Sequence, residues 1–582
     1  MHGFHNKILH IDLTRRSFEA ESVDDAVYRQ YLGGKGLSTW LLLNNTKAGV
    51  DPLSGDNALI FATGPATNSR IWGSSRYGVF TKSPLTGLYA ESYSGGTVAE
   101  PMNRIGYDAI VIKGACETPV YLEVSDAGVK FHHAYHIWGK DTYETEDIIR
   151  QEVGAKDVGI VVIGPAGENL VRFACIENNY WRSAGRTGVG AVMGSKKLKG
   201  IAFHGNRLHE VAKPALLEKL WEEMRCIGKE SLAVRGYRDV GTLQIVPLTN
   251  KAGAFPTKYW RLGTYDKWQS LTMQALKEKC KVKAHACPKC FLACGKLAEV
   301  LEGRHRGLKI EGPEYETVYA MGGLCMIDDI REIAYLNDIC DRLGIDTMTA
   351  GNLAAFTIEA SHIKDIGEKI EYGDVAGIAA LLHKMARREG IGAVLAEGIK
   401  HASKEWGLED LAIHVKGLEP AGYDPRVLKG MGLAYAVSDR GACHLRATVY
   451  KAELSGMIPP EQIQGKAEIV IDFEDRHTLF DSLILCRFFR DLYPWEKLST
   501  IIGATTGLEL DKKQLQQIAS RITNKAREFN LREGMRQIDE ELPKRFWEEK
   551  LEDSGKVLPK VEFEKMLSDY YNIKGWHAPV AK

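Results

Sequence analysis

Three cysteines lie close together near the middle of the chain: Cys287, Cys290 and Cys294. Thiolates at this spacing can bind one metal site together. A cubane iron–sulfur cluster is usually held by four cysteine thiolates, so a fourth from elsewhere would be needed. Zinc is an alternative, because it also takes four Cys or His ligands and His285 is close by. Buried structural thiols are a third interpretation. The candidates for the fourth thiolate are Cys280, Cys325, Cys340, Cys443 and Cys486.

Two glycine-rich segments that also carry arginine stand out, within residues 73–96 and 182–196. Glycine lets a backbone approach a phosphate closely, and its N–H groups form an anion-binding concavity. Arg76 and Arg182 could add bidentate pairing to phosphate oxygens. Neither segment is a standard nucleotide motif, since Met193 takes the third glycine position of a dinucleotide fingerprint. Tight turns in a β fold are the alternative, but two such loops would suit a ligand with several phosphates.

A cluster of carboxylates and a separate histidine could do acid–base chemistry. Glu311, Glu314 and Glu316 stand just before an apolar, helix-like run. A buried carboxylate with a raised pKa could act as a general base, whereas a solvated helix N-terminus that favours acidic residues is the simpler explanation. His444 is two residues before Arg446. A histidine in this setting can equally be a structural residue.

Two hexapeptides resemble each other, although they lie far apart in the chain. Residues 341–346 read Asp-Arg-Leu-Gly-Ile-Asp, and residues 481–486 read Asp-Ser-Leu-Ile-Leu-Cys. Their similarity suggests a pair of equivalent sites for a pseudo-symmetric ligand, and chance similarity is the alternative. No other internal repeat is visible in the sequence.

The elements that would position these residues differ between the two parts of the chain. Residues 1–208 are predicted to be β-rich, because short apolar runs such as 58–62 and 159–164 alternate with Gly, Pro and Asn. After Pro214, apolar residues recur at helical spacing. The segment 512–551 is also predicted to be helical.

Composition excludes several classes of protein. The 582 residues include 76 Lys plus Arg and 76 Asp plus Glu, so the basic excess typical of nucleic-acid binding is absent. No secretory signal and no apolar stretch near 18 residues is visible, so we expect a cytoplasmic chain without a membrane span. Eleven cysteines in such a chain favour metal ligation or buried thiols over a disulfide framework. The length predicts two to four domains, which we place at 1–208, 209–415 and 416–582.

Taken together, these segments resemble the aldehyde:ferredoxin oxidoreductase family of tungsten enzymes. The resemblance covers nearly the whole chain, and its motifs follow in the family's order. They are residues 8–13, 31–36, 82–87, 164–170, 312–316, the three cysteines, 542–546 and 570–571. The resemblance implies an α+β fold. An N-terminal domain of two β-sheets would cover the cofactor, and two mostly helical domains would follow.

The resemblance also implies the cofactors: two pterins that sandwich one tungsten, a [4Fe–4S] cluster and magnesium. The pterin phosphates and magnesium would be contacted by Arg76, Tyr93, Gly95, Arg182, Ser183 and Gly185. The pterin rings would be held by Asp341, Ile345, Asp346, Asp481 and Leu485, with Arg446 near the cofactor. The cluster ligands would be Cys287, Cys290, Cys294 and Cys486. Glu316 would be the general base, and His444 would hydrogen-bond the substrate carbonyl.

The sequence departs from the family pattern at several positions. Tyr93 stands where relatives carry Asn, at a position whose backbone carbonyl binds magnesium, and Ile484 replaces the glycine of the second hexapeptide. Tyr335 and Asp338 stand where some members carry the Glu-x-x-His of an iron that bridges two subunits. That iron is therefore not expected here, although we do expect an oligomer.

The predicted function is oxidation of an aldehyde, with water, to a carboxylic acid. Electrons would pass through the cluster to ferredoxin, or to an iron–sulfur adaptor subunit that works with a flavin subunit. The alternative within the same fold is the catalytic subunit of a tungsten-dependent reductase of aromatic acyl thioesters. A zinc or iron–sulfur scaffold without catalytic activity is the rival from another class. Tungsten and molybdenum are not distinguished by the sequence.

Overall fold

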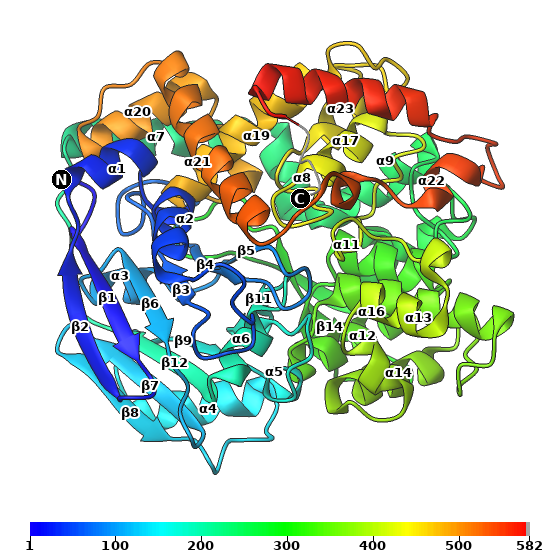
Figure 1. Ribbon diagram of the computed structural model, residues 1–582, viewed down its shortest axis with the longest axis horizontal. Helices are drawn as coiled ribbons and strands as arrows, with labels where there is room; N and C mark the ends of the chain where they lie inside the picture. Colours follow the sequence, from blue (N-terminus) through cyan, green and yellow to red (C-terminus); the bar gives the residue numbers. More distant parts are fainter. Residues whose placement is uncertain (578–582) are drawn as a thin grey trace.

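The computed structural model describes residues 1–577. The N-terminal part forms two six-stranded sheets, and the rest of the chain is mostly helical with one small three-stranded sheet. Figure 1 shows the sheets in blue to cyan at the lower left, with the helices in green to red above them and to the right. The predicted α+β fold, with two N-terminal sheets followed by helices, is confirmed.

The first sheet has the strand order β2-β1-β6-β3-β4-β5. Neighbouring strands are antiparallel except β1 and β6, which are parallel. The strands are β1 Lys7–Asp12, β2 Ser17–Ser22, β3 Leu59–Ala62, β4 Tyr77–Lys82, β5 Tyr89–Ser94 and β6 Ala109–Lys113. The predicted apolar run 58–62 forms the fully buried β3, as expected of a strand with both faces covered.

The second sheet repeats this arrangement. Its order is β8-β7-β12-β9-β10-β11, which is the order of the first sheet with six added to each strand number, and β7 and β12 are again the parallel pair. The strands are β7 Val120–Ser125, β8 Gly128–His133, β9 Gly159–Val162, β10 Ile176–Asn178, β11 Arg182–Ala184 and β12 Leu198–His204. The sequence shows no repeat in this part of the chain, but the strand order repeats. A strand order depends on backbone pairing, so it can repeat where side chains do not.

The two sheets share a hydrophobic core to which each contributes one face. Phe61 and Val79 of the first sheet belong to the same buried cluster as Leu122, Val161 and Phe203 of the second. The helices of this part of the chain are α1 Asp25–Tyr31, α2 Gly34–Asn45, α3 Ala99–Arg104, α4 Thr142–Val153, α5 Pro165–Glu168 and α6 Val189–Ser195.

The helical part begins at Pro214, as predicted. Four α-helices of this part precede the small sheet and one short α-helix directly follows it. They are α7 Pro214–Glu230, α8 Leu232–Val240, α9 Ile245–Ala252, α10 Met273–Lys279 and, after the sheet, α11 Tyr315–Thr317. The sheet itself comprises β13 Cys280–His285, β14 Gly295–Val300 and β15 Lys309–Glu311. The cysteine triplet lies between β13 and β14. A π-helical segment, Val318–Leu324, continues directly from α11.

Most of the remaining helices pack around one large core, and some contribute residues such as Leu498 and Leu515 to a second buried cluster. The remaining helices are α12 Ile330–Leu343, α13 Thr347–Ile363, α14 Val375–Arg387, α15 Ile391–Leu395, α16 Ile399–Trp406, α17 Lys429–Val437, α18 Val449–Leu454, α19 Lys466–Leu483, α20 Trp495–Thr506, α21 Lys512–Arg532, α22 Lys544–Glu548 and α23 Lys560–Lys574. The predicted helix 512–551 is too long, because α21 ends at Arg532. Gly534, in the left-handed region at φ 91°, and Pro543 separate it from α22.

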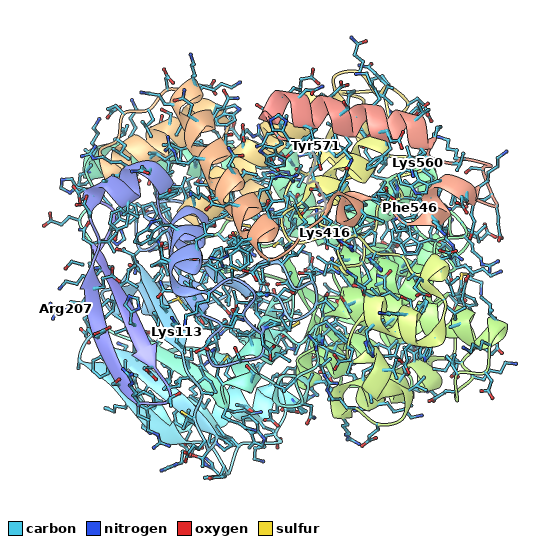
Figure 2. The ribbon with its side chains drawn as sticks, in the orientation of Figure 1. Lys113, Arg207, Lys416, Phe546, Lys560 and Tyr571 are labelled. Carbon is cyan, nitrogen blue, oxygen red and sulfur yellow. The ribbon has the colours of Figure 1, made fainter. Side chains whose placement is uncertain are left out.

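The C-terminal helix α23 is tied to the interior through the buried carboxylates of Glu474 and Glu540. Glu540 accepts a hydrogen bond from the hydroxyl of Tyr571 on α23, and its Oε1 lies 3.5 Å from Nζ of the buried Lys416 (Figure 2). None of the helices in residues 1–577 is long and apolar enough to cross a membrane.

Candidate functional site

Two adjoining cavities, of about 310 and 220 Å³, lie where the sheets meet the helices. Every residue predicted for the site lines at least one of them. The first cavity is lined by Arg76, Gly95, Arg182, Ser183, Gly185, Cys287, Cys290, Cys294, Glu316, Asp341, Ile345, Asp346 and Cys486. The second is lined by Arg76, Tyr93, Ser183, Gly185, His444, Arg446, Asp481, Leu485 and Cys486. The structure thus brings the whole predicted set together, and the role of each residue stays a prediction.

The two hexapeptides form the same turn at the ends of two helices. The helix α12 ends at Gly344 and α19 ends at Ile484, and both residues are left-handed, at φ 72° and 55°. Ile345 N–H donates to Cys340 O and Leu485 N–H donates to Phe480 O, which is the bonding of a Schellman turn. The missing glycine at Ile484 therefore does not change the turn. The left-handed conformation of Ile484 costs about 1–2 kcal/mol, because its side chain is strained there.

Glycines of the two sheets press against these turns in the same way. A Cβ on Gly64 would lie 2.2 Å from Leu483 O, and a Cβ on Gly164 would lie 2.3 Å from Leu343 O. No residue with a side chain could approach a helix end so closely. Each glycine lies just after a core strand of its own sheet, so the repeat in the sheets matches the repeat in the hexapeptides.

The surroundings of the two hexapeptide turns, which we call the half-sites of Asp341 and Asp481, differ in charge. The Asp481 carboxylate accepts hydrogen bonds from Arg446 Nη1 at 2.8 Å and Arg487 Nε at 3.2 Å. The equivalent Asp341 accepts only from the amide of Asn337, at 2.7 Å, among the side-chain bonds of the described residues. Burial, and then the neighbouring Glu177, raise the pKa of Asp341 well above its usual value. One half-site is therefore rich in arginine and the other in acid.

Cations around the cavities have unused hydrogen-bonding capacity. Arg446 Nε and Nη2, Arg487 Nη1 and Arg182 Nε are buried and find no partner in the part of the chain that the structure describes. Burial alone would raise the pKa of Glu91, but contacts with Arg446 and Lys35 hold it below its usual value. Free guanidinium donors are costly to bury unless an anion binds them. They fit a ligand with several phosphates, as predicted for the two pterins.

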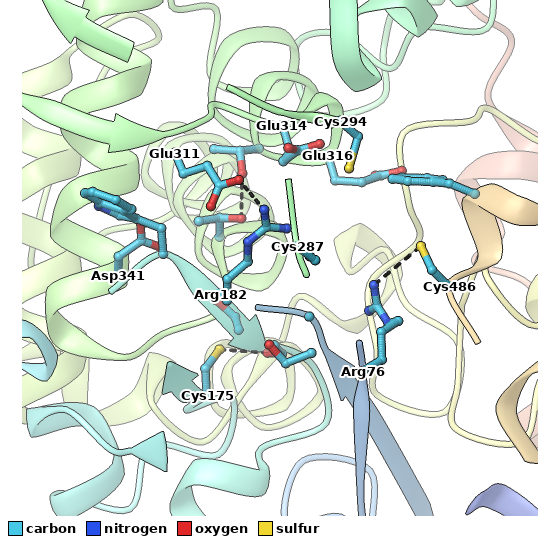
Figure 3. A pocket seen from close by; sticks show the side chains of 18 of the residues that line it. Arg76, Cys175, Arg182, Cys287, Cys294, Glu311, Glu314, Glu316, Asp341 and Cys486 are labelled. Atoms are coloured by element: carbon cyan, nitrogen blue, oxygen red, sulfur yellow. Dashed lines mark hydrogen bonds and ion pairs between the residues drawn. The ribbon is translucent and has the colours of Figure 1, made fainter. Parts of the chain in front are cut away.

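The four predicted cluster cysteines all line the first cavity. The N–H of Gly96 points to Cys287 Sγ at 3.3 Å, and Arg76 Nη1 lies 3.9 Å from Cys486 Sγ (Figure 3). A Cβ on Gly95 would lie 3.0 Å from the sulfur of Cys287, so glycine keeps this space open. Within residues 1–577, no three His, Cys, Asp or Glu side chains converge as ligands of a single ion.

The other candidate ligands from the sequence lie elsewhere. His285 Nδ1 is 3.1 Å from Glu311 Oε1, and Glu311 in turn accepts from Arg182 (Figure 3). Cys280, Cys325, Cys340 and Cys443 are buried in protein and line neither cavity.

Glu316 and His444 face each other where the cavities meet the helical core. Glu316 Oε1 is 3.3 Å from His444 Nε2, and the two side chains are 19% and 12% exposed. Oε2 accepts the N–H of Gly422 at 3.1 Å. Burial raises the pKa of Glu316 to about 8. Burial, and then the charge of Arg440, lower the pKa of His444 well below its usual value. At neutral pH the pair is therefore predominantly uncharged.

Polar atoms of this pair have no partner of their own. Glu316 Oε1 and His444 Nδ1 are buried without an aligned hydrogen bond in the described residues. Such atoms are available to a small molecule that enters the cavity.

Two residues that lie in or beside the site, Arg186 and Glu177, were not predicted from the sequence. Arg186 lines both cavities, with Nε 2.9 Å from Asp346 Oδ2 and Nη1 donating to Glu419 O at 2.9 Å. It follows Gly185 in the second glycine-rich segment, so its place in that motif was a usable signal. Glu177 accepts the Ser183 hydroxyl at 2.6 Å, and burial raises its pKa to about 8. No local pattern marks Glu177.

The family of the chain follows from this fold and from direct comparison. A family model described as the aldehyde ferredoxin oxidoreductase N-terminal domain matches residues 8–205, and a model of domains 2 and 3 of the same proteins matches residues 219–580. The chain is an oxidoreductase that belongs to the aldehyde ferredoxin oxidoreductase family. The cofactors of this family, a tungstopterin, a [4Fe–4S] cluster and a further metal ion, are those that the sequence predicted.

Particular relatives place the chain within the family. It is 36% identical to a tungsten-containing aldehyde ferredoxin oxidoreductase of Pyrococcus furiosus, over 99% of this chain and 97% of that protein. A protein of the same description from Pyrococcus abyssi is also 36% identical over the same shares. A solved structure, the active site complex BamBC of benzoyl coenzyme A reductase with 1,5-dienoyl-CoA, is similar with a TM-score of 0.85. It is 25% identical over 99% of this chain and 95% of that one.

Proposed function

We propose that this enzyme oxidises an aldehyde, with water, to a carboxylic acid, and passes the electrons through its [4Fe–4S] cluster to a protein acceptor. The observation that carries the proposal is the Glu316–His444 pair. It places a carboxyl group with a pKa near neutrality beside a neutral imidazole, and both keep unpartnered atoms. General bases are most effective when their pKa lies near the working pH.

The two half-sites would hold the pterins through the residues that line them. Asp341, Ile345 and Asp346 would hold one ring, and Asp481 and Leu485 the other. The phosphates and magnesium would be bound by Arg76, Tyr93, Gly95, Arg182, Ser183 and Gly185, with Arg446 nearby. The cluster would be bound by Cys287, Cys290, Cys294 and Cys486. When bound, the tungsten centre supplies a two-electron acceptor and a Lewis acid.

The protein's own groups would handle the proton and the developing charge. Glu316, once ionised, takes a proton from water or from the hydrated aldehyde through Oε1. The imidazole of His444 is neutral, and it donates a hydrogen bond to the carbonyl oxygen as negative charge develops there. Burial of both side chains keeps bulk water away and strengthens these interactions.

Both the electron acceptor and the reaction have an alternative. The acceptor is ferredoxin, or else an iron–sulfur adaptor that works with a flavin subunit. The similarity to the benzoyl coenzyme A reductase complex favours, as a second candidate, reduction of an aromatic acyl thioester. We further propose that the chain divides into domains at 1–208, 209–415 and 416–582, and that the protein assembles as an oligomer.

One experiment tests the cofactors and the reaction together. The protein is purified without air from cells supplied with tungstate and molybdate, and W, Mo, Fe and Zn are measured per chain by mass spectrometry. About one W and four Fe are expected, with aldehyde-dependent reduction of a viologen dye. Activity with aryl acyl thioesters alone would favour the second candidate. Zinc without W or Mo would overturn the proposal.

A further inference from the structure

Residues 420–423 connect the two candidate catalytic side chains without lining either cavity. The N–H of Gly422 donates to Glu316 Oε2 at 3.1 Å. The ring centroid of Tyr423 lies 5.8 Å from that of His444 and is stacked on Tyr450 at 4.0 Å, so the three rings form one cluster. This short segment thus touches both members of the pair.

Every carbonyl of this segment accepts a hydrogen bond from a tyrosine hydroxyl. The pairs are Pro420 O with Tyr319 at 2.5 Å, Ala421 O with Tyr435 at 3.0 Å, Gly422 O with Tyr315, and Tyr423 O with Tyr435 at 3.1 Å. The three tyrosines are almost wholly buried, with at most 2% exposure. They come from three elements: α11, the π-helical segment and α17.

This arrangement holds an irregular segment rigidly inside the protein. A buried backbone outside helices and sheets must find partners for its carbonyls elsewhere, and here the tyrosines supply them. Gly422 leaves almost no freedom, because a Cβ there would lie 2.7 Å from Cγ of Tyr319 and 3.0 Å from the ring of Tyr315.

The segment also decides which oxygen of Glu316 is available. Oε2 is occupied by the Gly422 N–H, so the free lone pairs are on Oε1, which faces His444. The ionisable groups that act on Glu316 from the surrounding elements are Arg186, Asp346, Cys443 and His444, together with the phenols of Tyr315, Tyr319, Tyr423 and Tyr435.

We propose that residues 420–423 are a positioning segment, fixed by the hydroxyls of Tyr315, Tyr319 and Tyr435, which orients the Glu316 carboxyl and the His444 ring. The role given to Glu316 rests on the proposed function, whereas the orientation itself does not. Tyr435 is the sharpest point to test, because its one hydroxyl serves two carbonyls and its ring lies outside both cavities.

The test compares Tyr435→Phe with Tyr28→Phe in the cofactor-loaded enzyme. Tyr28 is equally buried, and its hydroxyl donates to Asp108 in the first sheet region, so its variant also loses one buried hydroxyl. Amide exchange of peptides that cover residues 420–423 should become about fivefold faster or more in Tyr435→Phe only. The infrared band of the protonated Glu316 carboxyl, identified by its loss in Glu316→Gln, should titrate at higher pH.

The direction of that shift follows from the lost contact. The Gly422 N–H favours the ionised form of Glu316, so loosening it raises the pKa further. The acidic limb of kcat/KM should move to higher pH with it, while metal content stays the same. The proposal would be overturned if the two variants showed the same amide exchange, the same Glu316 infrared band and the same pH profile of kcat/KM. Faster exchange with an unchanged Glu316 band would also overturn it.

Two further results separate this proposal from the proposed function. If Glu316→Gln keeps full activity, the role of Glu316 as a base fails, but exchange and infrared data still decide the positioning. If Tyr435→Phe does not fold, Gly422→Ala keeps all the hydroxyls and displaces the segment by steric contact. An unshifted Glu316 band in that variant would equally overturn the proposal.

Discussion

The state of Glu316 predicts a particular pH dependence of the reaction. With a pKa of about 8, the carboxyl is about one hundredth ionised at pH 6 and about one tenth ionised at pH 7. If only the ionised form acts as a base, kcat/KM should rise about tenfold per pH unit up to pH 8 and level off above it. His444 adds no step in this range, because its pKa is lowered well below the usual value.

Glu316→Gln should abolish this dependence. Glutamine keeps the shape of the side chain and an oxygen for the Gly422 N–H, but it cannot take a proton. The rate should fall by about 10²–10⁴, the usual contribution of a positioned base. The assay is anaerobic dye reduction with an aldehyde from pH 6 to 9, with W and Fe measured in each preparation.

A second buried glutamate, Glu474, provides a matched control. Glu474→Gln also alters a buried glutamate, one bonded to Tyr570 and Lys574 away from both cavities, and should keep the pH profile. A fully active Glu316→Gln enzyme with normal W and Fe would refute the assignment. A wild-type profile that is flat between pH 6 and 8 would show that ionisation of Glu316 does not limit the reaction.

The remaining predictions concern the cofactor sites. Cys486→Ser should lower the iron content and weaken the signal of the reduced cluster in electron paramagnetic resonance, whereas the exposed Cys226 can be changed to Ser without either effect. Asp481→Asn should destabilise the protein by about 3–5 kcal/mol in denaturant unfolding, because it removes the carboxylate that pairs with the buried guanidinium of Arg487, whereas Arg446 keeps its contact with Glu91. Asp341→Asn should cost far less, since the side chain that donates to Asp341 is the neutral amide of Asn337 and no buried cation loses its partner. Protein from cells grown without tungstate or molybdate should have a lower Tm than loaded protein, because the ligand binds only the folded state.

Local motifs were predictable from the sequence, and long-range contacts were not. The cysteine triplet and the hexapeptides are short and carry their chemistry within a few residues. Spacing alone left five candidates for the fourth cysteine, and Cys486 was selected only through the family resemblance. The structure places it on the same cavity because α19 ends there.

Other parts of the site depend on residues that are far apart in the chain. The roles of Tyr435 and Gly422 cannot be recognised from the sequence, because they depend on the packing of α17 beside residues 420–423. The contact of Glu177 with Ser183 likewise depends on the pairing of β10 with β11. The matching sheets were equally hidden, because pairing of backbones can persist when side chains have diverged. The change from a β-rich part to a helical part was predictable, because the spacing of apolar residues changes near Pro214, whereas the α+β fold with two sheets was predicted only through the family resemblance.

The repeated strand order gives the site a symmetric frame and asymmetric chemistry. Two sheets with the same order and the same single parallel pair bring equivalent glycines against equivalent helix ends. The backbone therefore fixes two matching positions for a ligand, and the side chains are what tell its two halves apart. One helix end has glycine and the other isoleucine, and acids lie beside one turn while arginines lie beside the other.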